Sequence, residues 1–252
     1  MIETAKHIAK VGLSLLGFVA AWQLLCSLQL ANAALFPSPI AVWLAAGDLI
    51  KSGDFFDDLT VSLGRATVGF VVGASLGVAI GLLTARTRAF HLMLNPLFTI
   101  LRPIPAIALV PVAIVWFGIG EGSKYFVIAY TVFLSVWLNT HHGMEHVATL
   151  YIRAARSLGA SRLREFVMVV VPASAPHIFA GLRLGAALAF LSLVAAELTG
   201  ASAGIGYRLQ EARQFILMDR MFVGLIELGI LGALVDTAFV LLSRWLIHWE
   251  QS

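Results

Sequence analysis

The stretch "RAARSLGASRLREFVMVVVP" occupies residues 153–172 of a chain of 252 residues. Its arginines crowd together in a chain that is 60% hydrophobic and only 12% charged, and the sequence on either side is apolar enough to enter a lipid bilayer. The mean hydropathy of +0.90 lies far outside the range of soluble globular proteins. The sequence therefore predicts an integral membrane protein that is interrupted here by a polar, helix-permissive connection.

Runs of about 20 residues without charge, the length that crosses a bilayer as a helix, recur along the chain. They predict an all-α protein with about six membrane-spanning helices in a single domain over residues 1–252. The predicted spans cover about residues 11–31, 64–85, 94–118, 124–141, 178–199 and 221–247, and a cytoplasmic loop covers about residues 142–177. Four prolines interrupt the third span (Pro96, Pro103, Pro105 and Pro111), so regular helix is not expected throughout it.

The second predicted span carries glycines at a strict four-residue interval: Gly69, Gly73, Gly77 and Gly81. Residues at this interval line one face of a helix, and small residues let the backbone of a neighbouring helix come close. The row therefore predicts a packing face.

Arginine placement sets the expected orientation. If both chain ends are cytoplasmic, most arginines next to spans lie on the cytoplasmic side and the acidic connection 48–58 lies outside. Arg208, Arg213 and Arg220 are exceptions on the outer side. The net charge of +3 then reflects which loops stay in the cytoplasm. The lipid bilayer is an expected partner, and nucleic acid is not.

The opening stretch has features that a mere connection does not need. Ala154, Ala155, Leu158 and Gly159 fall on one side of a helix and form a small-residue surface suited to close docking. The neighbouring arginines are available to acidic groups of a partner. Pro172 and Pro176 predict a defined break before the fifth span, because the residue before a proline is biased away from helix.

These residues resemble the permease subunits of ATP-binding cassette importers, whose cytoplasmic loop carries Glu-Ala-Ala, three residues, Gly, nine residues and an aliphatic pair spaced before Pro. Here the pattern is Arg153-Ala154-Ala155, Gly159, Val169 and Val171-Pro172, with arginine in place of the family's glutamate. "NPLFTILRPIPAIALVPVAIVWFGIG" from Asn95 and "AAELTGASAGIGY" from Ala195 look like the nitrate, sulfonate and taurine importer group in particular.

The resemblance implies the architecture of a type I importer in a bacterial inner membrane. Its partners would be a second permease copy in a homodimer, two cytoplasmic ATPase subunits and an extracytoplasmic solute-binding protein. The resemblance places the ATPase contact on Arg153, Ala154, Ala155, Arg156, Leu158, Gly159, Ser161 and Arg162. The substrate would be a small anion such as nitrate, a sulfonate or taurine, although relatives also carry pyrimidine-like and aromatic compounds.

The sequence lacks a GxxxxGK[ST] loop, which cradles nucleotide phosphates. ATP and Mg²⁺ are therefore expected on the partner ATPase, and this chain is expected to be a transporter subunit with no catalytic residue, metal ligand or cofactor of its own.

Arg102 is the candidate pathway residue, because a charge near the centre of a bilayer costs roughly 2.5 to 3.5 kcal/mol. Pro103 and Pro105 remove backbone donors beside it, and irregular backbone at membrane depth must be buried in protein or face water. A constriction that passes an anion is one interpretation; the other is that Arg102 snorkels to the cytoplasmic interface.

Glu197 would either rim the outer mouth or lie in water. Glu227 and Asp236 point to opposite sides of one helix, so ion partners such as Arg183 or Arg220 are expected for them.

Two other functions remain open from the sequence. His142, Glu145 and His146 fit the HxxEH pattern of zinc proteases, which makes an intramembrane metalloprotease one alternative. An ion-coupled secondary transporter is the other, although the two halves of the chain show no evident shared pattern of the kind such transporters carry.

Overall fold

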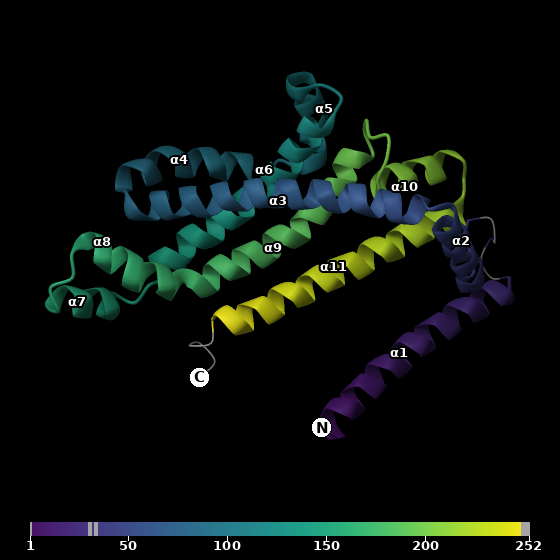
Figure 1. Ribbon diagram of the computed structural model, residues 1–252, viewed down its shortest axis with the longest axis horizontal. Helices are drawn as coiled ribbons and strands as arrows, with labels where there is room; N and C mark the ends of the chain where they lie inside the picture. Colours follow the sequence, from purple (N-terminus) through teal and green to yellow (C-terminus); the bar gives the residue numbers. More distant parts are fainter. Residues whose placement is uncertain (1, 30–31, 33–34, 248–252) are drawn as a thin grey trace.

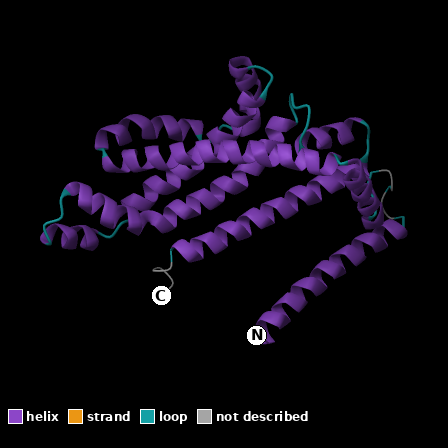
Figure 2. Cartoon of the chain, in the orientation of Figure 1, coloured by secondary structure: helices purple, strands orange, loops and turns teal. Residues whose placement is uncertain are grey.

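The computed structural model describes residues 2–29, 32 and 35–247, and these residues form helices joined by short turns without any strand (Figure 2). The predicted all-α fold class is confirmed. The helices are α1 (Ile2–Ser27), α2 (Pro39–Ser52), α3 (Asp54–Arg86), α4 (Arg88–Leu101), α5 (Ala106–Phe117), α6 (Glu121–Glu145), α7 (Thr149–Ser157), α8 (Arg162–Glu165), a π-helical turn η1 (Phe166–Val170), α9 (Val171–Glu197), α10 (Ile205–Gln214) and α11 (Met218–Leu246).

Three helices of the described residues are long and apolar enough to cross a membrane: α3, the continuous helix of residues 162–197, and α11. The bent pair of α4 and α5 makes a fourth if it counts as one span, and α1 contributes a shorter apolar stretch over Gly12–Ser27. The predicted end of the first span, residues 30 and 31, lies outside the described residues. The fourth predicted span corresponds to α6, which is less apolar because it packs between α3 and α9 rather than against lipid.

The glycine row is a packing face, as predicted, and α6 is its partner. A Cβ atom on Gly73 would lie 2.4 Å from the carbonyl oxygen of Ala129, and one on Gly77 would lie 2.8 Å from Cβ of Val136. Only glycine allows the two backbones to approach so closely. Ala189 and Leu193 of α9 complete the buried centre of this three-helix core.

The third predicted span is two helices rather than one. α4 begins at Arg88, earlier than expected, and α5 runs away from it at 105°. Pro103 and Pro105 occupy the break, where a missing N–H and a fixed φ prevent the helix from continuing. Pro96 and Pro111 are accommodated inside α4 and α5.

The expected break before the fifth span is absent. Helix continues from Arg162 to Glu197, and the chain absorbs Pro172 through the wide turn η1, in which the N–H of Val171 donates to the carbonyl of Phe166 five residues back. Such a π-turn supplies the extra space that a proline ring needs. Because α6 also extends to Glu145, the connection between α6 and the long helix that begins at Arg162 is shorter than the predicted loop 142–177.

The elements give the bundle two different ends, visible in Figure 1. α7 and α8 project at one end, called the hairpin end below, and α2 and α10 lie at the opposite end, called the network end. α1 stands away from the bundle and meets it mainly through Trp22, whose ring packs near Phe36 and Phe222. Large apolar side chains along α1, such as Leu13, remain exposed.

Candidate functional site

The stretch 153–172 folds as a helical hairpin made of α7, a short turn and α8. Gly159 adopts φ +76, a left-handed conformation that favours glycine. The N–H of Gly159 donates to the carbonyl of Arg156, and the N–H of Ala160 donates to that of Ala155, so the turn is a Schellman cap. The side chain of Ser161 then caps α8 by accepting from the N–H of Arg164. Gly159 and Ser161 therefore shape the turn.

A two-pronged ion pair closes the hairpin. Arg156 Nε and Nη2 donate to the two carboxylate oxygens of Glu165 at 2.7 and 3.0 Å. The hydrogen bonds that Arg156 donates to the Glu165 carboxylate raise the pKa of the Arg156 guanidinium. The guanidinium of Arg86, at the end of α3, lies 4.6 Å from the ring centre of Phe166 and ties the hairpin to the bundle.

Most of the predicted docking residues are exposed on this hairpin, and Leu158 is 89% exposed. Ala155 is the exception, because it is buried where α7 packs against α8 and η1. The small-residue surface expected on one side of the helix is therefore divided: Ala155 serves the inside of the hairpin, while Arg153, Ala154 and Leu158 face outward. Arg156 is engaged by Glu165 and is not free in the way expected.

Arg102 opens onto a groove of about 320 Å³ between the α4–α5 break, α6 and α9. Thr131, Ser135 and Asn139 follow one another at four-residue steps along α6 and supply its polar lining. Pro105 lines the same groove, whereas Pro103 does not. Thr131 Oγ1 and Asn139 Nδ2 already donate to backbone carbonyls of α6, so the donors left for a small anion are the Arg102 guanidinium, the unpartnered Ser135 hydroxyl and the second N–H of Asn139.

The position of Tyr130 shows how far along the bundle this groove lies. Its hydroxyl donates to the carbonyl of Leu101 at 2.6 Å, and Tyr130 lies well inside α6 rather than at either end. The neighbouring Arg102 therefore stands part-way along the bundle. Among the described residues, no carboxylate pairs with its guanidinium.

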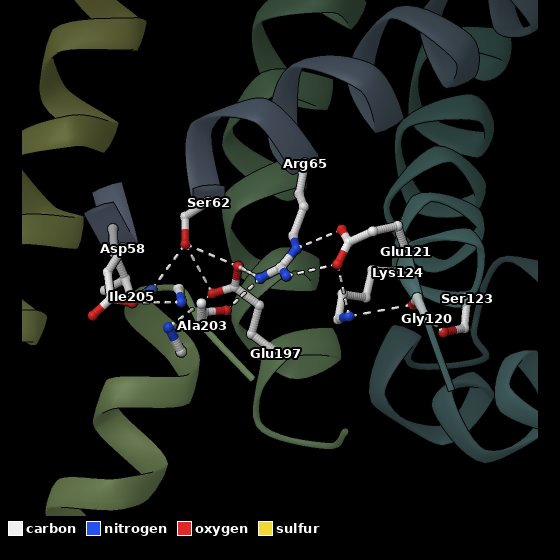
Figure 3. A network of polar contacts seen from close by, with 12 residues as sticks. Asp58, Ser62, Arg65, Gly120, Glu121, Ser123, Lys124, Glu197, Ala203 and Ile205 are labelled. Carbon is white, nitrogen blue, oxygen red and sulfur yellow. Dashed lines mark hydrogen bonds and ion pairs between the residues drawn. The ribbon is translucent and has the colours of Figure 1, made fainter. Parts of the chain in front are cut away.

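Glu197 belongs to a separate, buried polar network at the network end (Figure 3). Its carboxylate accepts from Ser62 Oγ at 2.8 Å, from Arg65 Nη1 at 2.8 Å and from the N–H of Gly206 at 2.8 Å. Arg65 also holds both oxygens of Glu121 at 2.7 Å each. Glu197 is 1% exposed, so the interpretation that it lies in water is wrong. It does not line the Arg102 groove.

The network explains the glycines of "ASAGIGY". A Cβ atom on Gly204 would lie 2.4 Å from Glu197 Oε1, and one on Gly206 would lie 2.6 Å from Cβ of Glu197. Gly204 also has φ +119. These glycines let the α9–α10 connection wrap around the carboxylate, which joins α3, α6 and α9 at one point together with Arg65. Sequence reasoning missed Arg65; its position just ahead of an uncharged run was the available signal.

Two further ion pairs account for other charges within helices. Arg183 donates to both oxygens of Asp236, at 2.5 and 2.8 Å, as expected for Asp236. The partner of Glu227 is Arg208, rather than Arg183 or Arg220, and Arg208 also donates to Asp58 at 3.3 Å. Arg208 departs from the expected placement of arginines on the cytoplasmic side because it is buried among carboxylates.

The HxxEH residues do not converge. The ring N–H of His146 donates to the backbone carbonyl of His142, so these two histidines do not close on Glu145. Within the described part of the chain, the group close enough to share a metal ion consists of His91, His141 and Glu145. The zinc site expected for an intramembrane protease is therefore not formed.

Comparison with known proteins decides the family. The profile of the "Binding-protein-dependent transport system inner membrane component" family matches residues 77–248. The chain belongs to this family. The permease is 38% identical over 234 residues to a putative aliphatic sulfonates transport permease of Bacillus subtilis, covering 93% of this chain and 85% of the relative. It is 34% identical to a nitrate import permease of Synechocystis, covering 91% and 86%. It is 31% identical to a taurine transport permease of Escherichia coli, covering 91% of this chain and 85% of the relative.

Solved structures show the same fold. The permease superposes on the MetNI methionine ABC transporter in its inward-facing conformation with a TM-score of 0.66 and 18% identity, covering 73% of this chain and 92% of that chain. An amino acid ABC transporter gives a TM-score of 0.63 at 16% identity, covering 81% and 97%. The predicted family and the type I importer architecture are confirmed, and the permease is a multi-pass inner-membrane protein.

Proposed function

We propose that this permease forms the translocation pathway of an ATP-driven, binding-protein-dependent importer. The observation that carries the proposal is the α7–α8 hairpin, a self-closed unit that projects from the bundle and exposes Arg153, Ala154 and Leu158 (Figure 1). A hairpin closed by a helix cap and a two-pronged ion pair is stiff, so a push on its tip reaches α6 and α9 instead of being absorbed locally.

The proposed assembly has two copies of this chain, two ATPase subunits at the hairpin end and a solute-binding protein at the network end. ATP and Mg²⁺ belong to the ATPase subunits, and closure of that pair drives the hairpins. The hairpin end then faces the cytoplasm, as do both chain ends. The isolated position of α1, with exposed apolar residues such as Leu13 and Leu16, supports a second copy or lipid as its neighbour.

The proposed substrate is a small anion, with sulfonates, taurine and nitrate as the classes to test first. Arg102 supports an anion because its guanidinium, part-way along the bundle, stands beside Thr131, Ser135 and Asn139 in one groove. Arg102 and Pro105 would shape the path and Pro103 would hold the break. Glu197 would act on the path by fixing the helices around it, because its own oxygens are already bonded.

The test is ATP-dependent uptake of taurine, an alkanesulfonate and nitrate into proteoliposomes that contain the permease with its genomic-neighbour ATPase and binding protein. Arg153→Glu should uncouple ATP hydrolysis from the binding protein and release the ATPase on size-exclusion chromatography. Arg213→Glu, an exposed arginine on α10 at the opposite end, is the control for ATPase release and should keep the ATPase bound. Release of the ATPase in both variants, or in neither, would refute the hairpin as the coupling element.

Arg102 separates the substrate proposal from the coupling proposal. Arg102→Ala should lower anion uptake roughly 10- to 100-fold, the range expected for losing a hydrogen bond to a charged group, while the ATPase stays bound. Arg102→Lys should retain more uptake because it keeps the charge. Unchanged uptake in Arg102→Ala would place the pathway elsewhere.

A further inference from the structure

A second cluster of polar side chains lies at the hairpin end, and neither the proposed pathway nor the coupling hairpin uses it. His91 of α4 and His141 of α6 face each other with Nδ1 of His91 and Nε2 of His141 3.0 Å apart. Glu145, one helical turn after His141, brings its Oε1 to 3.3 Å from the same Nε2. All three atoms lie within 4.8 Å of one another.

The contacts of Thr84 are compatible with a His141 tautomer that carries its hydrogen on Nδ1. Thr84 Oγ1 has one proton and donates it within α3, to the carbonyl of Ile80 or Gly81. The same oxygen accepts from the indole N–H of Trp137 at 3.2 Å. With its proton on one of these carbonyls, Thr84 Oγ1 accepts from the Nδ1–H of His141, 3.1 Å away, and this tautomer leaves the lone pair of Nε2 for a metal ion.

The neutral ring then presents the lone pair of Nε2 to His91 and Glu145. His141 is 3% exposed, so bulk water does not reach it. In this tautomer the lone pair of Nε2 and the Glu145 carboxylate oxygen, 3.3 Å apart, repel each other, and a cation between them would turn the repulsion into two attractive contacts. A histidine that donates one N–H to a neighbouring oxygen and turns its other nitrogen to a cation is the usual arrangement of a metal ligand.

We propose that His91 Nδ1, His141 Nε2 and Glu145 Oε1 form a zinc site. Two imidazoles and one carboxylate suit Zn²⁺ better than Mg²⁺ or Ca²⁺, which take oxygen ligands. A tetrahedral ion about 2.0 to 2.2 Å from each ligand separates the ligand atoms by about 3.3 to 3.5 Å. The two measured separations, 3.0 and 3.3 Å, lie close to that range.

The third separation, between His91 Nδ1 and Glu145 Oε1, shortens to the tetrahedral range when the Glu145 side chain, which is 49% exposed, turns inward. Its exposure also leaves the fourth position open to water. The site joins the first turn of α4 to the last turn of α6, only a few residues before α7 begins. It shares Glu145 with the HxxEH pattern but takes His141 and His91 as its histidines instead of His142 and His146.

The test is zinc binding by the tag-free, chelator-stripped permease in detergent, measured by titration calorimetry, with the visible spectrum of Co²⁺ as a second readout of tetrahedral coordination. The wild type should bind one Zn²⁺ per chain. His91→Gln and Glu145→Gln should each weaken binding by more than about 100-fold, since loss of an outer-shell partner alone costs about 10- to 100-fold. Both side chains are at least partly exposed, and size-exclusion chromatography checks that the variants stay folded.

The matched controls are His142→Gln and His146→Gln, which remove the HxxEH histidines and should leave the affinity unchanged. Thr84→Val is a positioning variant that should weaken Zn²⁺ binding about 10- to 100-fold and alter the Co²⁺ spectrum, because His141 loses the acceptor that fixes its orientation. The proposal is overturned if the wild type binds no stoichiometric Zn²⁺, if His91→Gln binds as tightly as the wild type, or if binding is lost in His142→Gln instead.

Discussion

The two ends of the bundle each contain an arginine that binds a glutamate through two hydrogen bonds, and the two arginines differ in burial. At the hairpin end, Arg156 holds Glu165 and is itself 63% exposed. At the network end, Arg65 is 5% exposed and shares its guanidinium between Glu121 and the fully buried Glu197. The contacts have similar lengths, 2.7 to 3.0 Å, so geometry alone does not distinguish them.

Burial makes the difference. Water and salt screen an exposed ion pair, which then contributes little to stability and acts mainly by fixing shape. A buried ion pair stabilises the fold little more than apolar residues of the same size would. Removing one partner is nevertheless costly, because it leaves the other charge buried and unpaired. We therefore expect the network end to determine whether α3, α6 and α9 stay assembled, and the hairpin end to determine what the assembly contacts.

The largest effect is expected from Arg65→Ala. Glu197 would keep only Ser62 and a backbone N–H as partners, so the free energy of unfolding should fall by about 3 to 5 kcal/mol. Thermal unfolding in detergent measures the loss. The stability of Arg65→Lys should lie between that of the wild type and that of Arg65→Ala, because an ammonium cannot bridge both carboxylates in the same way. A variant as stable as the wild type would show that the network is not needed for assembly.

A smaller effect is expected where α3 meets α6. Gly73→Ala places a methyl group against the backbone of Ala129 and should cost about 1 to 3 kcal/mol. Gly64→Ala, on the same helix but with open space at its Cβ, should instead stabilise by about 0.4 to 1 kcal/mol. Comparing the two unfolding midpoints separates helix propensity from packing, and equal shifts would contradict the close approach.

The smallest effect on stability is expected from Arg156→Ala. The unfolding midpoint should change little, since the Arg156 side chain is 63% exposed, whereas coupling of ATP hydrolysis to uptake should fall because the hairpin loses this ion pair. Glu165→Ala should reproduce both results. A large loss of stability in either variant would erase the distinction between the two ends.

Local patterns predicted much of this architecture. The glycine interval of the second span gave the face that α6 packs against, because side-chain direction in a helix follows from spacing alone. The prolines at positions 103 and 105 predicted irregular backbone where the 105° bend lies. The helix-permissive stretch around Ala154 and Ala155 is α7, which ends in the cap at Gly159.

Partners far apart in the sequence were beyond these patterns. Nothing local indicates that Glu227 pairs with Arg208 instead of Arg220, since the choice depends on how α10 folds back on α11. The same holds for Pro172, which predicts a break by itself and yet is absorbed by a π-turn. HxxEH shows the converse, because its histidines match a motif in sequence while the fold turns them to other contacts.

The sequence by itself determined that this chain is a helical membrane permease of a known importer family, because hydropathy, helix periodicity and turn residues act within a few residues of one another. The tertiary structure decided which charges are neutralised, which groove holds Arg102, and that His91 meets His141 and Glu145. Those outcomes depend on burial and on contacts between helices distant in the chain, where desolvation makes each unpaired charge costly and so selects the partners.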